Sequence, residues 1–128
     1  MRQRSAVFVA LAGGLLVCAP LRAHHSFAAE FDGNKPVVLK GMVTKVEWRN
    51  PHIWVYLDVK DADGAITPWQ CEGGAPNNLT RQGWSRETLK DGQEITVEGW
   101  RAKNGTNTCN ASAWKLPSGE SVFTKPAA

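Results

Sequence analysis

The chain has 128 residues, of which 15 are lysine or arginine and 12 are aspartate or glutamate, and this length fits a single domain. The first 23 residues contain three arginines and no acidic residue, so 12 basic residues remain to balance the 12 acidic ones in the rest of the chain. A neutral domain lacks the surplus of positive charge with which proteins bind nucleic-acid phosphates. We therefore expect no nucleic-acid partner.

Residues 1–23 have the layout of a secretory signal peptide. Arg2 and Arg4 form a basic start, an apolar run follows from residue 6 to residue 20, and Ala23 offers a small residue for cleavage. The apolar run is too short to span a membrane. The sequence therefore predicts a periplasmic or secreted protein without a stable membrane anchor.

Cleavage after Ala23 would make His24 the first residue of the mature protein. Cleavage after Ala28 is the alternative, because Ser26 is a small residue three positions before that bond. A lipid anchor on Cys18 is disfavoured, since the residue before it is a bulky valine. We expect soluble export rather than lipidation.

Residues 24–36 are predicted to form an irregular N-terminal arm with Phe27 and Phe31 as apolar anchors. Residues 37–48 are rich in β-branched side chains, which favours a strand. The apolar positions in that strand change phase at Gly41. A change of phase at a glycine predicts a β-bulge there.

The later strands are marked by alternation and by turn residues. Residues 52–59 alternate in the manner of a strand with one buried face, with Ile53, Val55, Leu57 and Val59 inward and His52, Trp54, Tyr56 and Asp58 outward. Further strands are expected at 65–71, 94–101 and 108–116, with a short last strand ending at residue 123. Pro68 predicts that part of its strand lies at a sheet edge or in a bulge. A short helix is expected from Asn77 or Asn78 to residue 82, ended by Gly83.

Three strands, a short helix and two further strands follow the order of an OB-fold, a five-stranded Greek-key barrel. The sequence thus predicts a mostly β, OB-like barrel with one short helix over residues 37–128. An immunoglobulin-like sandwich is the alternative, which the helix and the small number of strands disfavour.

Two cysteines follow the leader, Cys71 and Cys109. The third and fifth strands of an OB-fold are neighbours, and this would place the two cysteines close together. An oxidising compartment then favours a disulfide between them, which would contribute roughly 3–4 kcal/mol in the chain-entropy model. Two buried free thiols are the alternative.

The three histidines of the chain are His24, His25 and His52. If His24 is the first residue, its amine and imidazole can bind the same metal ion, and His25 or His52 can supply a further ring. Such a nitrogen set is suited to Cu or Zn. The alternative is that adjacent histidines in a terminal arm bind nothing.

Aromatic side chains form the second candidate site. Trp54 and Tyr56 share the outward face of one strand, and Trp48, Trp100 and Trp114 are also expected off the barrel interior. In OB-folds, ligands bind on the face of the second and third strands. We therefore predict ligand binding by Trp54, Tyr56 and Trp48. The alternative is that the arm covers this surface with its two phenylalanines.

The sequence contains no motif typical of catalysis. It has no glycine-rich phosphate loop, CxxC motif or HExxH motif. The acidic residues of the strands and loops are scattered and are expected to be solvated: Glu47, Asp58, Glu72 and Glu98. We therefore interpret the protein as a binding module rather than an enzyme.

Several segments resemble a known family. They are His24-His-Ser-Phe-Ala-Ala-Glu-Phe-Asp32, Gly41-Met-Val-Thr-Lys-Val-Glu-Trp48, Asn50-Pro-His52, Gly83-Trp84 and Leu89-Lys-Asp-Gly92. Together they resemble an uncharacterised bacterial secreted family, domain of unknown function 6152. The resemblance implies an exported small β-barrel domain and favours cleavage after Ala23, because members typically begin near the histidines. It implies no activity, substrate or catalytic residue.

Two hypotheses follow from these observations. The first is an exported binding or accessory module that binds a transition metal, Cu or Zn, through His24, His25 and His52. The alternative is a barrel that binds an oligosaccharide or another small ligand on the aromatic face of its second strand. A metal-dependent enzyme ranks third. The sequence predicts neither a particular protein partner nor an oligomeric state.

Overall fold

The structure is a computed structural model and describes residues 27–123. In that range the elements follow one another as α1 (Phe27–Glu30), β1 (Phe31–Glu47), β2 (Trp54–Lys60), β3 (Ile66–Glu72), α2 (Pro76–Arg81), β4 (Glu94–Ala102), β5 (Thr108–Lys115) and β6 (Ser121–Phe123). The predicted signal peptide and both His24 and His25 lie outside the described residues. The expected mostly β composition, with a short helix between the third and fourth strands, is confirmed.

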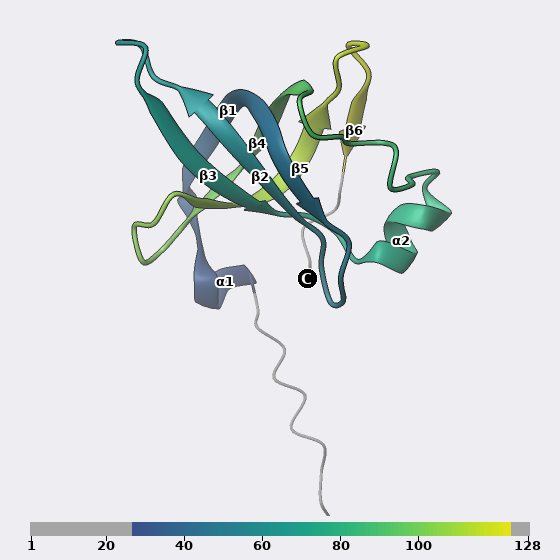
Figure 1. The fold of residues 1–128 in the computed structure, drawn as a ribbon. Coiled ribbons are helices and arrows are strands. Elements are labelled where there is room, and N and C mark those ends of the chain that lie inside the picture. The colour runs from purple at the N-terminus through teal and green to yellow at the C-terminus, as the bar shows by residue number, and fades with distance from the viewer. Residues whose placement is uncertain (1–26, 124–128) are drawn as a thin grey trace, which may run out of the picture.

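Five of the strands close into a ring. β1 pairs with β2 and β4, β2 pairs with β3, and β4 pairs with β5, all antiparallel. A short parallel pairing of β3 with β5 completes the ring, and β6 extends the sheet beyond β5 (Figure 1). Pro68 lies in the part of β3 that precedes the pairing with β5, so the expected edge position is confirmed.

β1 is longer than predicted because its first residues pair with the end of β4. Phe31 pairs with Ala102, and the pairing resumes at Pro36 after a register shift. Residues 31–36 are therefore part of a strand, and the expectation of an irregular arm is wrong for them. Residues Phe27–Glu30 form a single helical turn in front of that strand.

Gly41 does not form a bulge, which corrects the prediction. The irregularity in the β1–β2 register lies between Val43 and Lys45, three positions further on. A Cβ atom at Gly41 would lie 2.7 Å from the carbonyl oxygen of Asp58. Position 41 therefore requires glycine because the backbones of β1 and β2 approach each other too closely for a side chain. The alternation of inward and outward side chains along β1 is interrupted only after Val43. Met42 therefore points outward and is 46% exposed instead of joining the core.

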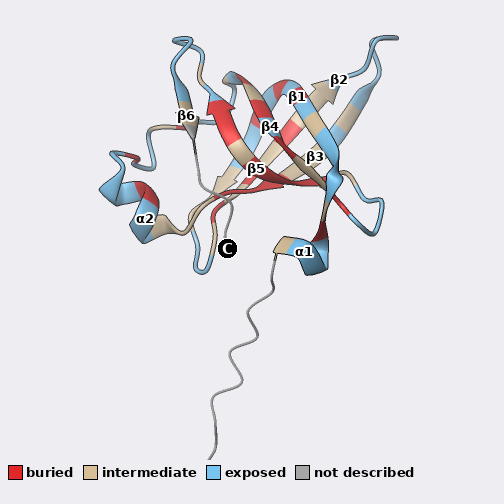
Figure 2. Ribbon diagram, turned by 180° about the vertical axis from the view of Figure 1, so that it is seen from behind, coloured by how far each residue is buried: buried red, intermediate tan, exposed pale blue. Residues whose placement is uncertain are grey.

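The buried residues, red in Figure 2, lie on the strands of the ring and in the connection after β3, and they form one hydrophobic core. Its inward residues on β2 include Ile53, Val55 and Leu57, as the alternation predicted. The β3–β4 connection adds Leu79, Trp84 and Leu89 to the same cluster. Within that connection, α2 starts at Pro76 rather than at an asparagine, which suits the first turn of a helix because proline lacks an N–H.

Trp114 lies in the core, so the expectation that it stands off the interior is wrong. The register of β4 with β5 shifts between Glu98 and Gly99, and after the shift Trp114 pairs with the inward-facing Val97. Its indole ring meets that of Trp84 edge to face, with 6.1 Å between the ring centres. One extra residue in a strand has therefore turned this tryptophan inward.

Candidate functional site

The outward side chains of β2, β3 and β5 form two rows across the parallel seam. In one row Trp54 is opposite Glu72, which pairs with Asn110; in the next row Tyr56 is opposite Gln70, which pairs with Thr108. Alternate residues of a strand share a face, so all six side chains lie on the same outer surface. The predicted common face of Trp54 and Tyr56 is therefore confirmed, and polar side chains continue it.

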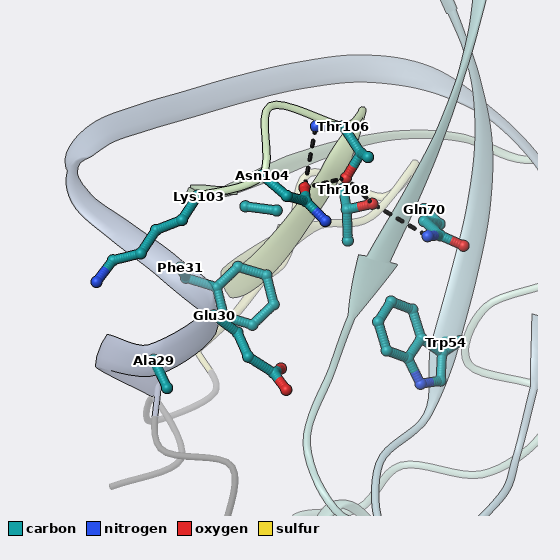
Figure 3. A pocket seen from close by; sticks show the side chains of 10 residues that line it. Ala29, Glu30, Phe31, Trp54, Gln70, Lys103, Asn104, Thr106 and Thr108 are labelled. Atoms are coloured by element: carbon teal, nitrogen blue, oxygen red, sulfur yellow. Dashed lines mark hydrogen bonds between the residues drawn. The ribbon is translucent and has the colours of Figure 1, made fainter.

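A cavity of about 460 Å³ opens on this surface, and we call it the Trp54 groove (Figure 3). Its walls come from α1, the start of β1, the faces of β2 and β3, and the β4–β5 connection. They are formed by Ala29, Glu30, Phe31, Trp54, Gln70, Ala102, Lys103, Asn104, Thr106 and Thr108. Segments that are distant in the sequence thus meet at one concave site.

A smaller hollow of about 260 Å³ adjoins the groove, and we call it the Tyr56 hollow. It shares Gln70, Thr106 and Thr108 with the Trp54 groove, and adds Tyr56, Pro68, Trp69 and Asn107. The two concavities therefore adjoin each other, on either side of these three shared residues. Each half contains at least one aromatic side chain.

A chain of hydrogen bonds runs along one wall of the groove, beside the Trp54 ring (Figure 3). Nε2 of Gln70 donates to Oγ1 of Thr108 over 3.0 Å. Oγ1 of Thr108 lies 3.0 Å from Oγ1 of Thr106, which lies 2.7 Å from Oδ1 of Asn104. Sequence reasoning missed these four residues because it looked for aromatic side chains. The alternation of β3, which places Gln70 on the outer face, was a usable signal for that one residue.

The β4–β5 connection is held by Arg101. Its guanidinium donates to the carbonyl oxygens of Gly105 and Thr106 and to Oδ1 of Asn107, over 2.9–3.1 Å. It also lies over the ring of Trp69, 5.3 Å from the ring centre. These contacts fix the loop that contributes Asn104 and Thr106 to the groove.

The arm covers only part of the outer aromatic surface. Phe27 meets Trp100 edge to face, with 5.3 Å between ring centres, and stacks on Phe31 at 5.7 Å. Trp54, by contrast, remains half-buried at the groove wall. Trp48 packs against the main core and does not line the groove. The predicted binding face thus keeps Trp54 and Tyr56, in two adjoining concavities.

His52, Glu72 and Asn110 form a polar cluster next to Trp54. Nδ1 of His52 contacts Oε1 of Glu72, and Nδ2 of Asn110 lies 3.5 Å from Oε2 of Glu72. Glu72 is 9% exposed and Asn110 is 5% exposed. The expectation that Glu72 is solvated is therefore wrong, because its position at the ring seam buries it.

Among residues 27–123, no group of three or more histidine, cysteine or acidic side chains is placed to hold a metal ion.

Cys71 and Cys109 are paired neighbours on β3 and β5, so the expected adjacency of these strands is confirmed. Both side chains are fully buried, and both are free thiols in the structure. Their Sγ atoms lie 2.7 Å apart. Burial raises the pKa of the Cys71 thiol well above its usual value, and the neighbouring Cys109 adds to that shift. The disulfide therefore stays a prediction.

Comparison with known proteins places the chain in a family. Within the described part of the chain, no helix is long and apolar enough to cross a membrane. No curated protein matches the chain. Residues 14–111, more than half of the chain, match the model of the Family of unknown function (DUF6152), which is the family that the sequence motifs resemble. The chain therefore belongs to this family of unknown function, DUF6152.

Proposed function

We propose that this protein is an exported binding module that takes a small ligand into the Trp54 groove. The observation that carries the proposal is the groove itself: a concavity of about 460 Å³ with an aromatic wall and a few convergent polar groups. Ligand sites in proteins typically have this size and composition. Because the lining offers no paired acids and no nucleophile next to a base, binding is favoured over catalysis.

The order of the strands in the ring supports an OB-like fold for this domain. The ring closes by a parallel pairing of β3 with β5, and α2 lies between β3 and β4. In OB-folds, the face of strands 2 and 3 and the loop between strands 4 and 5 bind ligands. The Trp54 groove uses these same parts, which supports a ligand site there.

Ligand binding is testable with a panel of small molecules. The panel would contain monosaccharides, disaccharides, nucleosides and amino acids, and binding would be followed by tryptophan fluorescence and calorimetry. We expect at least one class to bind, and we expect Trp54→Ala to weaken its affinity at least tenfold because the ring forms the groove wall. Val38→Ala is the control, since this side chain is 68% exposed on β1 and does not line the groove. No binding by any class, or equal binding by Trp54→Ala, would overturn the proposal.

A metal site at His52 is the second candidate, and one contact favours it. The contact of Nδ1 with Glu72 leaves Nε2 of His52 available, and metal-binding imidazoles are commonly oriented by a carboxylate on the other nitrogen. His24 and His25 would have to supply the remaining nitrogens for Cu or Zn. Calorimetry with Cu(II) and Zn(II) on the mature protein tests this. Affinity weaker than micromolar, or affinity unchanged by His52→Ala, would exclude the site.

A further inference from the structure

We propose that the ligand of the Trp54 groove is a neutral oligosaccharide of at least two sugar rings, with one ring in the groove and the next in the Tyr56 hollow. This inference rests on the proposed function and adds the chemical class and the length of the ligand. It follows from three properties of the depression: the direction of its hydrogen bonds, its charge and its division into two halves.

The hydrogen-bond chain has a fixed direction. Oδ1 of Asn104 can only accept, so the Thr106 hydroxyl donates to it. The Thr106 hydroxyl has one proton, and its shorter contact is the one to Asn104. In the 3.0 Å contact between the two hydroxyls Thr106 must therefore accept from Thr108, and the Gln70 amide donates to Oγ1 of Thr108. Every hydroxyl proton of the chain is thereby used within the protein.

Two amide groups remain to meet a ligand. Oε1 of Gln70 is an acceptor and Nδ2 of Asn104 is a donor, and neither takes part in the chain of hydrogen bonds. A ligand hydroxyl donates and accepts at once, so a molecule with several hydroxyls can satisfy both amides. Together with the flat indole of Trp54, on which the C–H face of a sugar ring packs, this is the chemistry that recognises a saccharide.

The charges at the groove do not select an anion. Lys103 is directed away from Trp54 (Figure 3), and its Nζ donates to the carbonyl oxygen of Ala28. Glu30, the other charged residue of the lining, is acidic and adds no positive charge to the groove. Arg101 is engaged by the β4–β5 connection and by Trp69. A neutral sugar therefore fits better than a sugar phosphate or an acidic sugar.

The division into two halves sets the minimum length of the ligand. The Trp54 groove and the Tyr56 hollow are neighbours that share Gln70, Thr106 and Thr108 in their linings. Trp54 and Tyr56 are two residues apart on β2, so their side chains are separated by about 7 Å along the strand. This separation is comparable to the length of one sugar unit. A linear oligosaccharide can thus place successive rings in the two halves.

The test compares neutral trisaccharides, their monosaccharides, a sugar phosphate and a nucleoside by calorimetry. We expect a neutral trisaccharide to bind more tightly than its monosaccharide, and Asn104→Ala to weaken both at least tenfold. Tyr56→Ala should weaken the trisaccharide only, because the monosaccharide occupies the groove. Asn77→Ala is the matched control, since Asn77 is an exposed asparagine on α2. A thermal unfolding curve for each variant confirms that it folds, and Tyr56→Leu, which keeps an apolar side chain but removes the flat ring, tests the hollow if Tyr56→Ala does not fold.

The binding results distinguish a failure of the saccharide assignment from a failure of the proposed ligand-binding function. Tighter, Trp54-dependent binding of the nucleoside or the sugar phosphate would overturn the saccharide inference and leave a small-ligand site in place. Equal loss of monosaccharide and trisaccharide affinity in Tyr56→Ala, or in Tyr56→Leu where that variant replaces it, would overturn the two-ring arrangement. Absence of any Trp54-dependent binding would overturn both.

Discussion

At the scale of single residues, Gly99 shows how closely two strands approach beside the candidate site. A Cβ atom at this buried position would lie 2.0 Å from the carbonyl oxygen of Asn110 and 2.8 Å from its carbonyl carbon. Asn110 belongs to the polar cluster with Glu72 and His52. Both obstructing atoms are backbone atoms, so a larger residue at Gly99 would have to displace β5 itself.

We therefore expect Gly99→Ala to lower the free energy of unfolding by about 3 kcal/mol, the upper end for overpacking in a core. Gly33→Ala is the control, because nothing lies within 4 Å of a Cβ atom there. That variant should stay within about 0.5 kcal/mol of the parent protein. Urea unfolding curves measure both values. If Gly99→Ala were as stable as Gly33→Ala, the close approach of β4 and β5 would not constrain the fold.

At the scale of elements, the ring is closed by its shortest pairing. β3 and β5 are joined at three positions, where Gln70, Cys71 and Glu72 pair with Thr108, Cys109 and Asn110. The outer two pairs are polar and belong to the candidate site, whereas the cysteine pair points into the core. A covalent bond between the cysteines would therefore fix the ring at the point where the groove is built.

We predict that Cys71 and Cys109 form a disulfide in the exported protein, each thiol losing one proton and one electron to the disulfide of an oxidising thiol enzyme. Peptide mapping without reductant should find the cross-linked pair. The oxidised protein should be more stable than the Cys71→Ala, Cys109→Ala double variant by roughly 3–4 kcal/mol.

The reduced protein provides the control for this prediction. Because burial raises the pKa of the Cys71 thiol, the thiolate is scarce in the folded state and alkylation should need denaturant. Two thiols that become alkylated in denaturant after recovery from an oxidising compartment would contradict the disulfide.

At the scale of the whole molecule, the described part of the N-terminal arm, residues 27–36, is part of the folded structure. Phe27 packs on Trp100 and Phe31, and the backbone N–H of Lys103 donates to the carbonyl oxygen of Glu30 over 2.8 Å. The arm thereby joins the start of the described chain to the β4–β5 connection. One wall of the Trp54 groove depends on this contact.

We expect the exported protein to begin at His24, because cleavage after Ala28 would remove Phe27 and expose Trp100. The intact mass of the protein recovered from the periplasm checks this. A protein made to begin at Ala29 is the comparison, and it should unfold at a lower temperature. A natural start at Ala29 would contradict the prediction and would also remove two of the three histidines of the metal hypothesis.

The sequence by itself determined the structural features that depend only on residues close to one another along the chain. The alternation of residues 52–59 placed Ile53, Val55 and Leu57 in the core, because a strand turns successive side chains to opposite faces. Gly83, with a φ of +91°, follows the short helix as expected, because glycine adopts this conformation without steric cost. The order of strands and helix also placed Cys71 beside Cys109.

Only the tertiary structure decided the features that depend on which strands meet. The register shift after Val43 and the inward turn of Trp114 arise from pairing with β2 and β4, and no local pattern of side chains specifies those registers. Glu72 is buried because the parallel pairing of β3 with β5 brings Asn110 beside it. The Trp54 groove joins residues from Ala29 to Thr108, and it exists only because a parallel pairing brings β5 beside β3. Asn104, Thr106 and Thr108 are close in the sequence, but only closure of the ring brings Gln70 beside them.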